Sequence, residues 1–259
     1  MPTISVIIPT YNSARTLPRA IKSAGGADEI IVVDDASTDD TQSVLSKLTK
    51  NLPNIKVIRN DYNVGADKSR NAGLKAVGSK WVTFLDADDY LSNQSIKRFK
   101  SIAANATMDI LQARIILRIS ALRIPYPIRS RYDVDKAIDA CLYDDRLFPI
   151  HCCGKFYRRE LLDSTDFIES IARWGEDRLF NLSVMSAMPR IEVDKSIRYN
   201  YVVRHGFNHH KRGNVAEEIR VVSTKKIDWC RDKGLDAYIS LVIQERSRLL
   251  EYVNNKLSK

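Results

Sequence analysis

Four short apolar runs punctuate the first hundred residues, and each is followed by a polar turn. The runs are rich in β-branched residues and lie at residues 4–8, 30–33, 55–58 and 81–85. Their apolar positions are continuous rather than alternating, which is typical of strands buried on both faces of a sheet. Helical spacing is found between them, at residues 14–24, 39–50 and 66–77. This alternation predicts an α/β fold with a mostly parallel sheet and helices on both faces.

The pattern changes in the second half of the chain. Periodicity there predicts helices at 93–104, 133–142 and 176–187, and strands at 109–119 and 197–203. A stretch containing Pro125 and Pro127 is predicted to be a loop, and so is the basic segment 204–213. From about residue 215 the spacing is helical to the end of the chain. The sequence therefore predicts an α/β body followed by C-terminal helices.

Composition places the chain among ordinary globular proteins. It has 259 residues, of which 44% are hydrophobic and 28% charged. No apolar run approaches the roughly 18 residues of a membrane span, and no basic-then-apolar leader opens the chain, so we expect a cytoplasmic protein. The four cysteines show no metal-ligand spacing and are expected to be reduced and mostly buried: Cys141, Cys152, Cys153 and Cys230.

The net charge of +9 is concentrated in two segments that contain no acidic residue, 114–131 and 195–213. Such segments attract phosphate groups, whether on a nucleotide or on a lipid surface. Nucleic acid is not expected as a partner, because no DNA- or RNA-binding motif accompanies the charge. We expect a peripheral contact with anionic membrane at the inner face of the plasma membrane, although a solvated basic face would give the same composition.

Three carboxylates, Asp86, Asp88 and Asp89, directly follow the fourth predicted strand. Open α/β sheets bind their ligands at the carboxyl ends of strands. Neighbouring acids repel one another unless a cation lies between them, and oxygen ligands suit Mg²⁺ or Mn²⁺ shared with a substrate phosphate. Alternatively, an aspartate here caps the helix predicted to begin near Asn93.

Similar polar patterns follow the other strands. Pro9-Thr10-Tyr11-Asn12 follows the first, Asp34-Asp35-Ala36-Ser37-Thr38-Asp39 the second, and a segment from Asn63 to Gly73 opens the third helix. With these patterns in this order, the chain resembles family 2 of the inverting glycosyltransferases, which have the GT-A fold. The resemblance is strong over residues 1–100, traceable to about 205, and lost over the last fifty residues.

The residue types at the strand ends suit a nucleotide. The Tyr11 ring can stack on a base, and Asp35 can accept a hydrogen bond from the imide N–H of uracil. Gly65 lets the main chain approach the nucleotide, and Arg70 supplies charge beside it. Asp34 is expected to be structural or to contact the sugar.

The resemblance adds further roles in the same half of the chain. It implies that Asp86 lies near the ribose and that Asp88 binds the metal that bridges the diphosphate, the DXD motif of such enzymes. Pro9 and Ala87 complete the residues expected to bind the nucleotide sugar.

The acceptor and the catalytic base are expected in the second half. Trp174-Gly175-Glu176-Asp177 resembles the family's Glu-Asp motif, which makes Asp177 the implied base. The alternative is that these acids only complement a helix N-terminus. Further residues expected at the acceptor or diphosphate are Trp174, Glu176, Lys155, Arg204 and His205. One of His205, His209 and His210 either completes the metal shell or contacts the diphosphate; alternatively, these histidines belong only to a basic loop. Cys153 departs from the family pattern, which often has a large residue there.

The resemblance implies a metal-dependent hexosyl- or N-acetylhexosaminyltransferase that uses a nucleotide-diphosphate sugar, and we expect the nucleotide to be UDP. The implied acceptor is a glycan or a lipid-linked glycan of a bacterial surface polysaccharide. We expect residues 1–213 to form the GT-A domain, with sugar-nucleotide binding in 1–100 and the acceptor and catalytic part in 101–213, and residues 214–259 to form a helical extension. The alternatives are a non-catalytic sugar-nucleotide-binding subunit that needs a partner enzyme and a nucleotidyltransferase, whose glycine- and lysine-rich activation loop is not visible.

Overall fold

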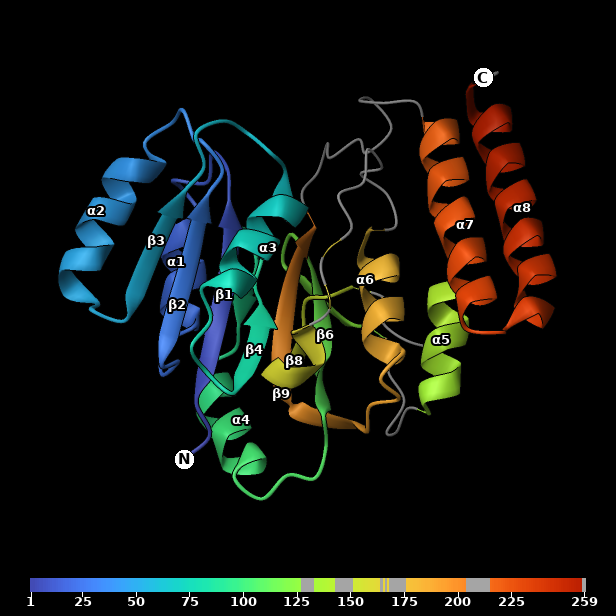
Figure 1. The fold of residues 1–259 in the computed structure, drawn as a ribbon. Coiled ribbons are helices and arrows are strands. Elements are labelled where there is room, and N and C mark those ends of the chain that lie inside the picture. The colour runs from blue at the N-terminus through green and yellow to red at the C-terminus, as the bar shows by residue number, and fades with distance from the viewer. Residues whose placement is uncertain are drawn as a thin grey trace.

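One sheet runs through the molecule, and helices pack on both of its faces (Figure 1). The computed structural model describes residues 1–126, 133–142, 151–163, 165, 167, 176–203 and 215–257. The described strands are ordered β3-β2-β1-β4-β8-β6-β9-β5, with β7 paired to β6. The predicted α/β architecture of the GT-A type is therefore confirmed.

The first four strands are parallel, as the apolar runs predict. They are β1 (Ile4–Thr10), β2 (Glu29–Asp34), β3 (Ile55–Arg59) and β4 (Trp81–Phe84). Every residue of β1 and β4 is buried, because helices cover both sides of this part of the sheet. Thr10 pairs with Asp34, so β1 and β2 end level with each other. The polar residues that follow them are consequently brought to one edge.

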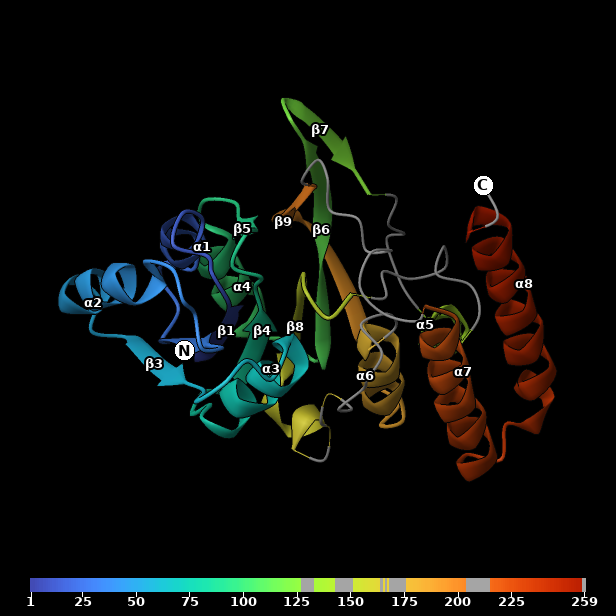
Figure 2. The same ribbon diagram turned by 90° about the horizontal axis from the view of Figure 1, so that it is seen from above.

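Helices on the two faces hold this sheet in place. Figure 2 shows α1 (Leu17–Ser23) and α4 (Ser95–Ala103) on one side and α3 (Ala66–Lys75) on the other. The helix α2 (Thr41–Asn51) connects β2 to β3. Gly73 is required where α3 crosses β1, since a Cβ atom there would lie 2.5 Å from Cγ2 of Ile7. That close approach packs the last turn of α3 against the middle of β1.

The second half of the sheet is mixed. The strand β8 (Lys155–Arg158) runs antiparallel to both of its neighbours, β4 and β6 (Ile110–Ile119). The strand β9 (Ile191–Val203) pairs parallel with β6, and the short β5 (Tyr90–Leu91) pairs antiparallel with β9. The strand that directly follows the aspartate cluster, β5, is therefore paired with β9.

Three strands of this half depart from the sequence predictions. Residues 122–125 were predicted to be a loop but form β7 (Leu122–Pro125), because their apolar residues alternate and a proline is tolerated at the end of an edge strand. The predicted strand 197–203 begins earlier, at Ile191, where polar residues hide its pattern. No strand was predicted for β8, whose four residues are too few to show a period.

The remaining helices lie beside this second half (Figure 1). They are α5 (Val134–Leu142), α6 (Glu176–Met185), α7 (Val215–Asp232) and α8 (Ile239–Leu257), with short 3₁₀ turns at Arg159–Leu162 and Asp236–Tyr238. None of the helices in the described ranges combines the length and the apolar character needed to cross a bilayer. All four cysteines are free and buried, as predicted. The division of the chain at residue 213 stays a prediction, since residues 204–214 lie outside the described part.

Candidate active site

The loops after β1 and β2 are tied to each other. Asn12 has a left-handed φ of 47° and its side-chain oxygen accepts the main-chain N–H of Thr38 at 2.8 Å. The N–H of Asn12 donates in turn to Oγ of Ser37 at 2.9 Å. Tyr11 is left 48% exposed beside this junction, whereas Pro9 is buried within β1. The ring of Tyr11 is thus available for stacking on a flat ligand.

The two aspartates after β2 are both buried and both hydrogen-bonded within the protein. Asp34 pairs with Arg59 and accepts the N–H of Ser37 at 3.0 Å. Asp35 accepts the main-chain N–H groups of Val64 at 2.9 Å and Gly65 at 2.8 Å. Each carboxylate therefore has a structural role, and Asp35 fixes the loop that leads into α3. The predicted contacts of Asp34 with a sugar and of Asp35 with uracil stay predictions.

The start of α3 supplies the positive charge of the site. Gly65 precedes the helix with a φ of 93°, a conformation that favours glycine, and no atom lies within 4 Å of where a Cβ would be. One turn later, Arg70 is buried between two carboxylates. It donates to Oδ1 of Asp86 at 2.9 Å and to Oδ1 of Asp67 at 3.2 Å. Arg70 thus connects α3 to the end of β4.

Asp67 is a carboxylate that the sequence analysis did not single out. Burial, opposed by the charge of Arg70 and reinforced by that of Asp177, raises the pKa of Asp67 to about 6. The group therefore changes charge close to neutral pH, next to the arginine that faces Asp86.

The three carboxylates that follow β4 are divided between two roles. Asp89 is fixed by β9, where its oxygens accept from the Tyr199 hydroxyl at 2.6 Å and from the N–H of Val202 at 2.7 Å. Burial and the charge of Asp86 raise the pKa of Asp89 to about 8. Asp86 and Asp88 stay half-buried, with Ala87 buried between them. Only these two aspartates of the cluster are therefore candidates to bind a cation.

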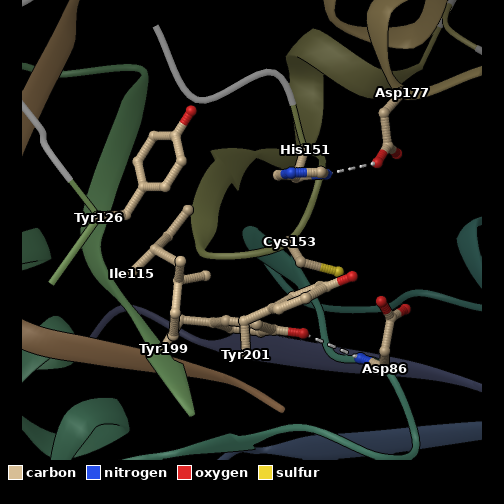
Figure 3. A pocket seen from close by; sticks show the side chains of 9 residues that line it. Asp86, Ile115, Tyr126, His151, Cys153, Asp177, Tyr199 and Tyr201 are labelled. Atoms are coloured by element: carbon tan, nitrogen blue, oxygen red, sulfur yellow. Dashed lines mark hydrogen bonds and ion pairs between the residues drawn. The ribbon is translucent and has the colours of Figure 1, made fainter. Parts of the chain in front are cut away.

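The end of β4 and the start of α6 meet at one pocket of about 110 Å³ (Figure 3). Asp86 and Asp177, which lie far apart in the sequence, both line it. Aromatic and apolar residues form the rest of the wall: Ile115, Leu117, Tyr126, His151, Cys153, Tyr199 and Tyr201. The structure thus brings the predicted donor-side aspartate and the predicted base to the same space.

Asp177 is held by a histidine. Nδ1 of His151 lies 3.5 Å from Oδ2 of Asp177, and the imidazole stacks on Tyr201 with ring centroids 6.0 Å apart (Figure 3). The other oxygen, Oδ1, is buried without a hydrogen-bond partner among the described residues. Burial would raise the pKa of Asp177, but the hydrogen bond with His151 and the charge of Arg70 outweigh it and hold the pKa well below the usual range. Asp177 is therefore ionised at neutral pH and able to accept a proton.

Lys155 contacts the pocket residue His151 from a buried position. It is fully buried, and its ammonium group donates to the main-chain oxygen of His151. Burial lowers the pKa of Lys155 to about 8. The lysine therefore fixes the main chain at His151. The side chain of Glu176 and residues Trp174, Arg204 and His205 lie outside the described part, so their predicted roles stay predictions.

Sequence reasoning missed several residues of the pocket wall. Tyr199 and Tyr201 point to one side of β9, a signal that alternation along the predicted strand carries. His151 gave no comparable signal, because it contacts Asp177 only through the fold. Tyr126 falls in the segment that was predicted to be a loop.

The donor set fits a hard divalent cation. Mg²⁺ and Mn²⁺ bind to one or two carboxylates and complete their shells with water and substrate phosphates. Asp86 and Asp88 offer two such carboxylates at the strand end. In the described ranges no group of three or more His, Cys, Asp or Glu side chains is placed to hold a metal ion. The cation would therefore depend on the phosphates of its ligand.

The model of the family "Glycosyl transferase family 2" matches residues 5–165, which is more than half of the sequence. The chain belongs to glycosyl transferase family 2. One relative of this family 2 chain is the poly(ribitol-phosphate) beta-N-acetylglucosaminyltransferase TarS of Staphylococcus aureus, 28% identical over 83% of this chain and 38% of that protein. Another is the GalNAc(5)-diNAcBac-PP-undecaprenol beta-1,3-glucosyltransferase of Campylobacter jejuni, 46% identical over 35% of this chain and 31% of that protein. The chain thus spans well under two thirds of these relatives.

A solved structure supports the same assignment. Residues 1–349 of S. aureus TarS in complex with UDP match with a TM-score of 0.65 and 25% identity, over 92% of this family 2 chain and 70% of that chain. The predicted family and fold are both confirmed.

Proposed function

We propose that this family 2 protein is a metal-dependent inverting glycosyltransferase that moves a hexosyl or N-acetylhexosaminyl group from a UDP-sugar to a glycan or a lipid-linked glycan of a bacterial surface polysaccharide. The observation that carries the proposal is the pocket shared by Asp86 and Asp177. Direct displacement needs a donor site and one carboxylate within reach of the acceptor hydroxyl. The names of the relatives favour a UDP-linked donor and a surface-polymer acceptor.

Asp177 is the proposed base. As the acceptor oxygen forms its bond to the anomeric carbon, the hydroxyl proton passes to the carboxylate, and the bond to the diphosphate breaks with its electron pair on the leaving oxygen. The low pKa of Asp177 makes it a weak base, so proton transfer is expected to accompany bond formation rather than precede it. His151 orients the carboxylate through the contact with Oδ2.

The donor is proposed to lie along the strand ends. Tyr11 stacks on the base, and the loop that is hydrogen-bonded to Asp35 lies around the base. Gly65 and Arg70 face the phosphates. Asp86 and Asp88 would hold the cation, which stabilises the charge on the departing diphosphate when it is bound. Asp67 tunes the charge at Arg70, because it ionises near neutral pH.

The experiment is a panel of sugar nucleotides, with thermal stabilisation and release of the nucleotide as readouts. UDP-sugars are expected to raise the melting temperature in Mn²⁺ but not in EDTA, and UDP is expected to bind more tightly than GDP in calorimetry. Tighter binding of GDP would contradict the uracil assignment. Binding of UDP-sugars without turnover on any acceptor would favour the non-catalytic subunit.

A further inference from the structure

The strands β6 and β7 form a hairpin with two chemically different faces. The pairs Leu117–Ile124 and Ile119–Leu122 lie on one face, and the pairs Ile116–Pro125 and Arg118–Arg123 lie on the other. A two-residue turn joins the strands. The hairpin is therefore amphipathic near its turn, where one face is apolar and the other carries two arginines.

The tip of this hairpin is unusually exposed for its composition. Leu122 is 62% and Ile124 44% exposed. Figure 2 shows β7 at the outer edge of the described elements, whereas the adjoining end of β6 is also paired with β9, as far as Val203. Single exposed apolar residues are common, but two neighbours on one face form a patch that typically marks an interaction site.

The apolar face is continuous with the pocket. Leu117, which pairs with Ile124, lines the pocket, and so do Ile115 on the same face of β6 and Tyr126 directly after β7. One pair before the turn of the hairpin, the guanidinium of Arg118 lies 5.6 Å from the centre of the Tyr90 ring in β5, so β6 stays in contact with the rest of the sheet at this end. The hairpin is thus attached to the site rather than to a distant surface.

We propose that the β6–β7 hairpin docks on an anionic lipid bilayer, with Leu122 and Ile124 entering the interface and Arg123 contacting lipid phosphates. Charge complementarity favours this occupant, because residues 110–132 contain no acid. A second copy of the chain is disfavoured, since pairing two such hairpins would place like charges side by side. The bilayer contact would hold the pocket toward a lipid-linked acceptor, and this part rests on the proposed function.

The test is co-sedimentation with vesicles of phosphatidylcholine and phosphatidylglycerol at low salt. The double variant Leu122→Ser/Ile124→Ser is expected to lower the partition coefficient about tenfold, because the inserted apolar surface is lost. Arg123→Gln should lower the partition coefficient about fivefold on these anionic vesicles and leave it unchanged on vesicles of phosphatidylcholine alone. The controls are Val57→Ser, an exposed apolar residue on the edge strand β3, and Lys47→Gln on α2, which should bind like wild type.

Calorimetry with UDP and Mn²⁺ on the same variants separates this proposal from the proposed function. The hairpin variants should bind UDP as wild type does, because their changes lie outside the strand ends of β1, β2 and β4. Equal sedimentation of wild type and the double variant, or no sedimentation of wild type at low salt, overturns membrane docking. Concentration-dependent self-association that the double variant abolishes, with no vesicle binding, would instead make the hairpin a contact between copies.

Discussion

Glu245 on α8 is the acid that two buried cations share, and replacing it with glutamine is expected to destabilise the fold. Its Oε1 accepts from Arg178 of α6 at 2.6 Å and its Oε2 from Lys226 of α7 at 2.7 Å. All three side chains are buried. The C-terminal helices are thus joined by charge to the helix that carries Asp177.

The magnitude follows from the burial of both cations. Removing one partner of a buried ion pair costs roughly 3–5 kcal/mol, because the remaining charge is left without compensation. Lys226 keeps a second acceptor, the main-chain oxygen of Leu142 at 2.6 Å, so we expect Glu245→Gln to cost about 3 kcal/mol at pH 7.

The loss should depend on pH in a defined direction. Burial, together with the charge of Arg178, lowers the pKa of Lys226 to about 8 despite the attraction of Glu245. Lys226 is therefore charged at pH 7 and mostly neutral at pH 9. At pH 9 the substitution consequently removes the ion pair of only one cation, Arg178. The difference in free energy of unfolding between wild type and Glu245→Gln should shrink between these two pH values.

Urea unfolding at pH 7 and pH 9 measures both effects. The matched control is Glu251→Gln, an exposed residue on the same helix, which should change the free energy of unfolding by less than about 0.5 kcal/mol. A Glu245→Gln protein as stable as this control at pH 7, or equally destabilised at both pH values, would refute the reasoning.

Three further predictions concern the site. Asp88→Ala should abolish the Mn²⁺ dependence of UDP binding in calorimetry, and unchanged affinity with and without EDTA would remove Asp88 from the metal site. As the pH rises from about 4 to 6, the folded chain keeps the proton of Asp67 that the unfolded chain loses, so the free energy of unfolding falls by about 3 kcal/mol. Asp67→Asn should flatten the curve of unfolding free energy against pH, whereas the exposed Asp61→Asn should not. His151→Phe keeps the ring beside Tyr201 but removes the donor to Asp177, so the acid limb of the pH–rate profile should move to higher pH; an unmoved limb would show that the histidine does not act on the base.

The first half of the fold was predictable because its signals are local. Buried parallel strands read as continuous apolar runs, and each run ends in polar residues such as Asp34 or Asp86 that the parallel geometry brings to one edge. The same reasoning could not separate the role of Asp89 from the roles of Asp86 and Asp88. Asp89 is fixed by Tyr199 and Val202 of β9, and no local pattern announces a contact between segments so far apart.

The second half was harder to predict for the same reason. The position of His151 beside Asp177 arises only when β8 inserts between β4 and β6, and a strand of four residues carries no periodicity. The hairpin at Leu122 was obscured by Pro125, which ends a strand rather than excludes one. Buried charges such as Glu245 look in the sequence like solvated helix positions, since only packing against α6 distinguishes them.

The most direct test of the account is the Asp177→Asn variant, measured for UDP release from UDP-GlcNAc with Mn²⁺ and for UDP affinity by calorimetry. Asparagine keeps the shape of the side chain but cannot accept the proton, so turnover should fall at least about 100-fold while the dissociation constant for UDP stays within about threefold of wild type. Turnover retained within about threefold of wild type would contradict the assignment of Asp177 as the base.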